Sequence, residues 1–143
     1  MKKLIVASDE RTNLTDVIIK YLREKSYDLI LLGDLVDENK RWKWVEIGKE
    51  VAQKIVNKEV DQAILFCWSG TGICMSANRF KGVRAALCWD AETAKLARKW
   101  DDATVLCLSL RYTSETVAKE IIDAWFSTKF DEEGLNEAQK LDE

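Results

Sequence analysis

Two short apolar runs on either side of a glycine-rich turn restrict the fold of this chain more than any other feature of its sequence. The first run, Ala63–Cys67, leads directly into the turn, and a helical stretch to Asn78 then leads into the second run at residues 83–88. Apolar runs of this length predict buried strands, so the order strand, turn, helix, strand predicts a βαβ unit. Ligands of an open parallel sheet bind at the carboxyl edge of its strands. The thiol of Cys67 is expected at that edge.

The rest of the chain alternates between strand-like and helix-like segments in the same way. This alternation predicts an α/β fold in which helices cover both faces of a five-stranded parallel sheet, a three-layer αβα Rossmann-like sandwich. A chain of 143 residues without a linker or a low-complexity stretch is expected to form one domain, 1–143. Asn13 is the expected N-cap of the first helix. The further strands are expected at residues 4–8, 29–32 and 104–108, the further helices at 13–25, 42–57, 90–100 and from 113 or 114 onward, and a polar loop at 34–40.

Composition narrows the class of partner and of cofactor. The net charge of −3 argues against nucleic acid or an anionic membrane as the main partner. No apolar run approaches the roughly 18 residues that span a bilayer, so the expected location is the cytoplasm. The four cysteines lack C-x-x-C spacing and the chain has no histidine, a pattern that argues against a metal site. Cys74, Cys88 and Cys107 are expected to be buried, reduced thiols.

Four motifs follow one another without insertion: a strand that ends in Cys67, the loop 69–72, a helix that ends Ala-Asn-Arg at residues 77–79, and a strand that reads Arg-Ala-Ala-Leu-Cys at residues 84–88. This pattern resembles the family of ribose-5-phosphate isomerase B and the galactose-6-phosphate isomerase subunits, and the resemblance extends over nearly the whole chain to Phe130. It implies an aldose–ketose isomerase that acts on a sugar or sugar phosphate without a metal or organic cofactor. It also implies a homodimer or homotetramer whose active sites use residues from both subunits.

The resemblance implies roles for individual residues. Cys67 matches the family's catalytic cysteine, the base that moves a proton between C1 and C2 of the sugar, and Ser69 matches a threonine that assists ring opening. A thiolate can act as such a base where a helix N-terminus stabilises it, and Cys67 precedes one. Backbone N–H groups of the loop would stabilise the enediolate by roughly 3 kcal/mol per donor, although the glycines have a competing, purely structural interpretation as a tight turn. The expected substrate-binding residues are Ser8, Asp9, Glu10, Gly70, Thr71, Gly72, Trp100 and Arg111.

The chain departs from the family at the positions where histidine is expected. Glu10 stands in place of the His of a Ser-Asp-His segment, and Trp100 stands in place of the His that helps to open the sugar ring. Trp44 begins a segment that replaces Tyr-Pro-Asp-Tyr. Because no imidazole is available, Asp101 is the nearest candidate for a ring-opening acid.

The tail departs from the family in its charge. Glu132 and Glu133 fall in the segment where the family has phosphate-binding arginine. These carboxylates would repel a phosphate that arginine would bind through charge-assisted hydrogen bonds. Either another cation binds the phosphate, or the substrate preference has shifted from ribose 5-phosphate. The candidate cations are Arg11, Lys43, Arg79 and Arg111.

Three functional hypotheses follow from these observations. The first is an isomerase of the family with a shifted substrate preference. The second is a non-catalytic paralogue that binds a sugar or sugar phosphate, or that serves as one subunit of a hetero-oligomeric isomerase. The third is a flavodoxin-like nucleotide-binding protein, which the topology allows because fold does not determine function. The loop has neither G-x-G-x-x-G nor the Walker lysine, which argues against the third hypothesis.

Overall fold

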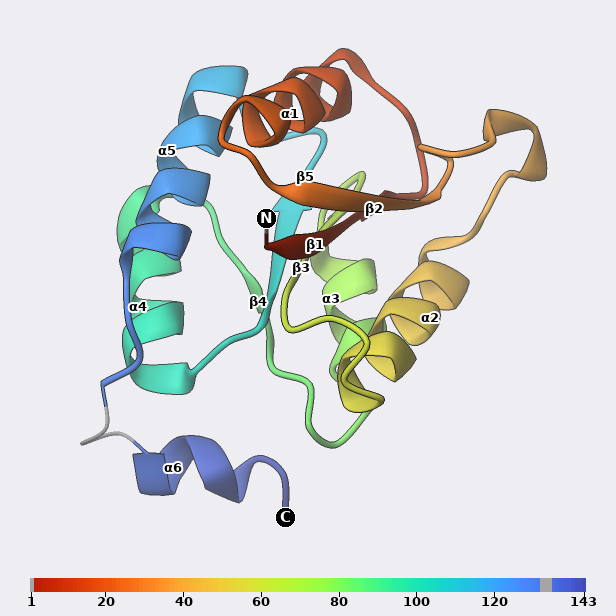
Figure 1. The fold of residues 1–143 in the computed structure, drawn as a ribbon. Helices are drawn as coiled ribbons and strands as arrows, with labels where there is room; N and C mark the ends of the chain where they lie inside the picture. The colour runs from red at the N-terminus through yellow and green to blue at the C-terminus, as the bar shows by residue number, and fades with distance from the viewer. Residues whose placement is uncertain (1, 132–134) are drawn as a thin grey trace.

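The computed structural model describes residues 2–131 and 135–143. Its centre is a five-stranded, fully parallel sheet in the order β2-β1-β3-β5-β4 (Figure 1). The predicted five-stranded parallel sheet is therefore confirmed. The strands are β1 (Lys3–Ser8), β2 (Asp28–Gly33), β3 (Ala63–Cys67), β4 (Ala85–Leu87) and β5 (Val105–Ser109).

Helices cover both faces of this sheet, as expected for a three-layer sandwich. One apolar core lies between the sheet and α1, α4 and α5, and a second core lies between the sheet and α2 and α3. None of the described helices is long and apolar enough to cross a membrane. The helices are α1 (Asn13–Glu24), the 3₁₀ turn η1 (Glu38–Lys40), α2 (Trp44–Val56), α3 (Thr71–Ala77), α4 (Ala91–Asp101), α5 (Glu115–Ser127) and α6 (Leu135–Lys140).

The alternation of side chains along β3 explains why both faces need a helical layer. Ile64 and Phe66 point into the core beneath α1, α4 and α5, whereas Leu65 and Cys67 point into the core beneath α2 and α3. Every residue of β3 and β5 is buried, while β2 and β4 at the two edges of the sheet are mostly half-buried. A strand that is apolar on both faces is typical of the interior of a parallel sheet.

The start of α1 differs from the predicted cap. Thr12 is the N-cap in place of Asn13, because its hydroxyl accepts a hydrogen bond from the Thr15 amide while the Thr15 hydroxyl accepts one from the Thr12 amide. This reciprocal pair satisfies two amides that the helix itself leaves without partners. Asp90 and Ser114 cap α4 and α5 as expected.

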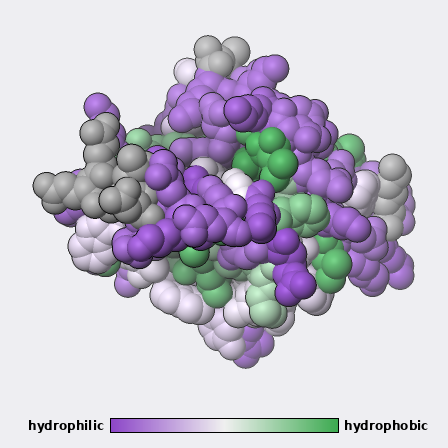
Figure 2. Space-filling model, turned by 90° about the horizontal axis from the view of Figure 1, so that it is seen from below, coloured by the Kyte–Doolittle hydropathy of each residue, from purple (hydrophilic) through white to green (hydrophobic). Residues whose placement is uncertain are grey.

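The C-terminal segment is attached to the loop that precedes β4. The carboxylate of Asp142 accepts hydrogen bonds from the Gly82 amide at 3.0 Å and from the Arg84 guanidinium at 3.0 Å. The same guanidinium also pairs with Asp102 at 3.1 Å. Seen from below, the side of the molecule on which α6 lies is largely hydrophilic, and its apolar side chains form separate patches (Figure 2).

The two helices on the second face approach each other unusually closely at Gly48. A Cβ atom at this position would lie 2.5 Å from Ser76 Oγ and 2.6 Å from Ser76 Cβ, and the Ser76 hydroxyl is already held by the Val45 carbonyl at 2.7 Å. Alanine normally favours a helix over glycine by about 1 kcal/mol. At this position the steric clash opposes that preference.

We predict that Gly48→Ala lowers the free energy of unfolding by about 1–3 kcal/mol, because overpacking outweighs the gain in helix propensity. Urea unfolding followed by circular dichroism measures the change. Lys49→Ala is the matched control, because Lys49 is exposed on the same helix. A more stable Gly48→Ala variant would show that α3 moves away from α2 at little cost.

Candidate active site

The sheet reverses its direction of growth between β1 and β3, and ligands of open α/β sheets bind in the crevice at such a point. The chain passes from β1 outward to β2, then returns to the other side of β1 to form β3. Ser8 at the end of β1 pairs with Phe66 near the end of β3. Asp9 and Cys67 therefore lie at the same carboxyl edge, which confirms the predicted arrangement of these two residues.

The loop after β3 has a shape that requires glycine. Gly70 has a φ of 79°, and a Cβ atom there would lie 2.6 Å from Leu87 Cδ1 and 3.1 Å from the Leu108 carbonyl carbon. Gly70 is also the N-cap of α3, so the first amides of that helix have no partner within the helix, and the Thr71 amide donates a hydrogen bond to Ser69 Oγ at 3.4 Å. Beside them, the hydroxyls of Ser69 and Thr71 are 2.7 Å apart and share a hydrogen bond. The loop thus combines backbone donors and a hydroxyl pair immediately after the Cys67 thiol.

The indole ring of Trp44 packs against one side of this loop, a contact that the sequence did not predict. A Cβ atom at Gly72 would lie 2.9 Å from Trp44 Cε3, so the indole ring is in contact with the loop backbone. Trp44 begins α2 and remains 40% exposed. Its position in the segment that replaces Tyr-Pro-Asp-Tyr was the signal in the sequence that could have indicated this role.

Among the carboxyl groups at this edge, that of Asp9 has the most strongly shifted pKa. Burial is the largest effect, and together with the nearby carboxylates of Glu10 and Asp34 it raises the pKa of Asp9 to about 6, although Lys43 acts in the opposite direction. Asp34 is itself almost buried and accepts a hydrogen bond from the Trp42 amide at 2.9 Å. A carboxyl group with a pKa near 6 can hold or release a proton close to neutral pH.

Ser8 and Glu10 shape the turn on which Asp9 lies. The Ser8 hydroxyl is fully buried, donates a hydrogen bond to the Glu10 carbonyl and accepts one from the Glu10 amide at 3.2 Å. Both hydrogen bonds join the Ser8 hydroxyl to the backbone of Glu10, so this hydroxyl faces the turn. The Glu10 side chain is exposed at the same edge of the sheet.

Arg111 brings a positive charge to the same edge at the end of β5. Its amide donates a hydrogen bond to the Trp68 carbonyl at 3.0 Å, which ties the loop after β5 to the loop after β3. Its guanidinium lies over the rings of Trp68 and Tyr112, at 5.9 Å and 5.2 Å from the ring centroids. Contacts of this kind hold a cation through the electron-rich face of the ring.

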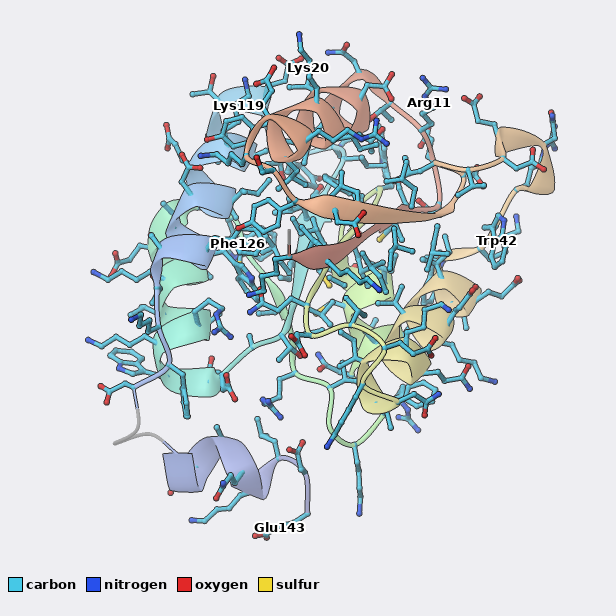
Figure 3. The ribbon with its side chains drawn as sticks, viewed as in Figure 1. Arg11, Lys20, Trp42, Lys119, Phe126 and Glu143 are labelled. Carbon is cyan, nitrogen blue, oxygen red and sulfur yellow. The ribbon has the colours of Figure 1, made fainter. Side chains whose placement is uncertain are left out.

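The other predicted cations are arranged differently. Arg11 extends toward solvent from the loop after β1 (Figure 3), and its guanidinium pairs with Asp16 at 2.9 Å and with Glu38 at 3.4 Å. Arg79 follows the far end of α3 and lines a surface groove between α2 and α3. Lys43 and Arg111 are thus the members of the predicted set that lie near Asp9 and Cys67, respectively.

The structure does not bring Trp100 and Asp101 to this edge within one chain. Both residues end α4, and a helix that connects parallel strands runs back to the amino edge of the sheet, where β5 then begins at Val105. A five-residue strand spans about 17 Å, so Asp101 and Cys67 are separated by roughly the length of the sheet. The predicted order of a helix at 90–100 and a strand at 104–108 already implied this separation, so the assignment of Trp100 and Asp101 to the Cys67 site by resemblance is corrected for the single chain. The predicted tail residues Glu132 and Glu133 lie outside the described residues.

The sequence pattern of the Ribose/Galactose Isomerase family matches residues 4–143. The chain belongs to this family. It is 36% identical over 143 residues to the probable ribose-5-phosphate isomerase B of Mycoplasma genitalium, with 97% of this chain and 91% of that protein covered. It is 33% identical over 139 residues to the D-erythrulose-4-phosphate isomerase of Pectobacterium atrosepticum, with 96% and 89% covered.

A solved structure of this family supports the same assignment. Ribose-5-phosphate isomerase B of M. genitalium with bound ribulose-5-phosphate matches with a TM-score of 0.82 at 32% identity, covering 96% of this chain and 94% of that one. The prediction of a sugar-phosphate aldose–ketose isomerase of this family, with a Rossmann-like fold, is therefore confirmed. Among the described residues, no group of three or more cysteine, aspartate or glutamate side chains is arranged to hold a metal ion.

In this member of the Ribose/Galactose Isomerase family, the raised pKa of Asp9 makes the stability of the fold depend on pH. Because the folded-state pKa lies above the ordinary value of 3.8, the ionised carboxylate destabilises the fold above pH 6. This cost disappears as the pH falls from about 6 toward 3.8. We predict that Asp9→Asn is more stable than the wild type at pH 8, by about 1–2 kcal/mol after allowance for solvent screening, and that the difference vanishes near pH 4.

Urea unfolding of both proteins at several pH values measures this difference. Asp90→Asn serves as the control, because hydrogen bonds from Thr93 lower the pKa of Asp90. The pH dependence should then have the opposite sign, with the advantage of aspartate present at neutral pH and lost in acid. An Asp9→Asn effect that is independent of pH would mean that Asp9 is well solvated.

Proposed function

We propose that this chain isomerises a sugar phosphate that exists mainly in open-chain form, such as a tetrose 4-phosphate, with Cys67 as the mobile base. The observation that carries the proposal is the contrast between the two edges of the sheet. Thiol, loop amides and Asp9 meet at the carboxyl edge, whereas Trp100 and Asp101, at the positions of the ring-opening machinery, lie at the amino edge. The chain also contains no histidine. Proton transfer is therefore provided for at this edge, whereas ring opening has the Ser69 hydroxyl but no imidazole.

A tetrose 4-phosphate needs no ring-opening acid. Its O4 oxygen is esterified to phosphate and cannot close a five-membered hemiacetal ring, so the aldehyde or ketone is available directly. The relative from P. atrosepticum, whose name gives D-erythrulose 4-phosphate as its substrate, supports this choice. The family member solved with ribulose-5-phosphate supports phosphorylated sugars as the wider substrate class.

The proposed proton transfer uses residues of the carboxyl edge. The Cys67 thiolate removes the proton from the carbon next to the carbonyl. The electron pair of that C–H bond forms the C=C bond of an enediolate, while the carbonyl π pair moves to the oxygen. Amides of loop 70–72 stabilise the negative oxygen. The thiol then returns its proton to the neighbouring carbon, while Asp9 exchanges the hydroxyl proton, a task suited to a pKa of about 6.

Charge along the edge orients the substrate in this proposal. The order of the strands along the carboxyl edge places Asp34 after β2, Asp9 after β1, Cys67 at the end of β3 and Arg111 after β5. Neighbouring strands are about 4.8 Å apart, so Asp9 and Arg111 lie roughly 10 Å apart along the edge. The phosphate is placed near Arg111 and the hydroxyls near Asp9, which leaves the reacting carbons beside the thiol.

A second copy of the chain is proposed to cover this edge. Several large apolar side chains around the site are more than half exposed, among them Trp68 at 54% and Tyr112 at 70%. Exposed aromatic side chains of this size are typical of interfaces. A homodimer with shared sites, as the family resemblance implies, would supply the far wall of the site. The proposed location of this dimer is the cytoplasm.

The competing hypothesis is a sugar-phosphate-binding protein without activity, or one subunit of a hetero-oligomer. The relative named galactose-6-phosphate isomerase subunit LacB in Clostridium acetobutylicum motivates the subunit alternative. Binding and catalysis differ in one observable, because only catalysis exchanges the substrate's carbon-bound proton with solvent.

We predict that the protein incorporates deuterium from solvent into a tetrose 4-phosphate, and that ribose 5-phosphate is a poorer substrate. No imidazole is available to open the ring of ribose 5-phosphate, and general acid catalysis typically contributes about 10²–10⁴-fold, so kcat/KM for ribose 5-phosphate should be lower by about 100-fold or more. NMR detection of deuterium at C1 and C2 over a panel of free and phosphorylated C4 to C6 sugars measures both. Ligand-induced thermal shifts without exchange into any sugar would support the binding protein instead. Equal turnover of ribose 5-phosphate would contradict the shifted preference.

We predict that Cys67→Ser lowers the rate of deuterium exchange by about 10²–10⁴-fold without unfolding the protein, because serine is similar in size and a poor base at neutral pH. Cys88→Ala is the matched control, since Cys88 is equally buried but packs on the opposite face of the sheet. Exchange at the wild-type rate in Cys67→Ser would exclude Cys67 as the base and make Asp9 the first residue to test.

A further inference from the structure

The hydroxyl of Ser109 lies where the carboxyl ends of β3 and β5 meet. Ser109 is the last residue of β5 and pairs with Cys67, the last residue of β3. Its side chain is buried, with 1% of the residue exposed, although serine is mostly found at protein surfaces. A buried hydroxyl needs hydrogen-bond partners, so the partners of Ser109 indicate what this side chain does.

Both partners of the Ser109 hydroxyl lie in loops at the carboxyl edge. The hydroxyl donates a hydrogen bond to the Trp68 carbonyl at 2.8 Å, in the loop after β3. It accepts one from the Tyr112 amide at 2.9 Å, in the loop after β5. A hydroxyl has a single proton, and this proton is used by the Trp68 carbonyl. Ser109 therefore holds two segments of backbone together and is not placed to transfer a proton.

The two hydrogen bonds enclose Arg111. The bond to the Tyr112 amide closes the turn 109–112, a side-chain contact to nearby backbone that is typical of serine, and Arg111 lies inside this turn. The Trp68 carbonyl also accepts the hydrogen bond from the Arg111 amide, so two donors of the same loop hold it. Trp68 and Tyr112 carry the two rings over which the guanidinium lies. One hydroxyl thus fixes the backbone of both aromatic residues.

We propose that Ser109 is a positioning residue that determines where the Arg111 guanidinium lies relative to the Cys67 thiol. The inference rests on the proposed function, which places the phosphate near Arg111. The Arg111 side chain is exposed, and long exposed side chains have many rotamers. The direction in which this side chain leaves the backbone therefore decides what it can reach, and the Ser109 hydroxyl fixes that direction.

The thiol depends less on this hydroxyl than the guanidinium does. The Cys67 carbonyl accepts a hydrogen bond from the Leu110 amide at 3.0 Å, which continues the pairing of β3 with β5 and does not involve the Ser109 side chain. Loss of the hydroxyl should therefore weaken the binding of phosphate more than it slows proton transfer. A change in KM without a matching change in kcat is the kinetic sign of such a loss of binding.

Ser109→Ala removes the hydroxyl and with it the partner that the Tyr112 amide has in the structure. We expect inorganic phosphate to bind about 10-fold more weakly, the effect of one polar group left without its partner, in an NMR titration of the folded protein. Hydrogen exchange of the Tyr112 amide should become faster. With a sugar phosphate that the protein turns over, KM should rise by about the same factor, while kcat changes by less than about 3-fold.

Thr128→Val is the matched control. The Thr128 hydroxyl donates a hydrogen bond to the Ala124 carbonyl at 2.7 Å at the far end of α5, about 20 Å along the helix from its start. This substitution also removes a hydroxyl that holds a carbonyl, but it does so away from both loops. Its affinity for inorganic phosphate should equal that of the wild type.

A double-mutant cycle with Arg111→Met distinguishes positioning from a general structural effect. Arg111→Met should itself weaken phosphate binding, and the addition of Ser109→Ala should then cause no further loss, because the hydroxyl acts through the guanidinium. Additive losses in the cycle would overturn the inference. An unchanged phosphate affinity or an unchanged exchange of the Tyr112 amide in Ser109→Ala, or a loss confined to kcat, would also overturn it.

The same measurements separate this inference from the proposed function. If Arg111→Met binds inorganic phosphate as tightly as the wild type does, both the phosphate site and the role of Ser109 are refuted. If phosphate binds through Arg111 and Ser109→Ala weakens it, but no sugar phosphate exchanges its carbon-bound proton, the proposed isomerisation is refuted and the role of Ser109 stands.

Discussion

The hydrogen bonding of β3 between β1 and β5 is the constraint on which the rest of the molecule depends. Because the three strands are parallel and in register, the residues that follow them emerge at one edge. Asp9, Cys67 and Arg111 are far apart in the sequence, yet each begins or ends a loop at that edge. The side chains of β3 are apolar on both faces of the sheet. A face without a helical layer would leave apolar side chains in water, so both faces must be covered. The position of the site is thus a consequence of sheet packing.

The same arrangement produces a gradient of charge along the edge. Carboxylates follow β1 and β2, and a guanidinium that lies over two aromatic rings follows β5. The thiol lies between these regions. In the proposed orientation the anionic end of the substrate lies toward the β5 end, and Lys43 partly offsets the carboxylates near Asp9. In the proposed function, the absence of histidine leaves the proton transfer in place and favours substrates that need no ring opening.

Patterns in the sequence predicted the sheet, the loop and the positions of Asp9 and Cys67, because each depends on neighbouring residues and on the rule that parallel strands share an edge. The contact between Trp44 and Gly72 could not be predicted, since it depends on the angle at which α2 meets the loop. The environment of Asp9 was equally inaccessible, because Asp34 approaches it only through the pairing of β1 with β2. Trp100 and Asp101 show a different case, because the predicted order of helix 90–100 and strand 104–108 already implies that the helix ends at the amino edge, away from Cys67 within one chain.

The contact of Trp44 with the glycine loop also makes the molecule optically sensitive to events at that loop. An indole ring that is partly in water and partly against the backbone emits light according to how much water reaches it. A ligand that occupies the loop would exclude water from Trp44, and from Trp68 beside the thiol, and so shift their fluorescence. The chain has six tryptophans, but Trp125 is 1% exposed and would contribute a constant background. Occupancy of the edge can therefore be followed by intrinsic fluorescence, without a label and without turnover.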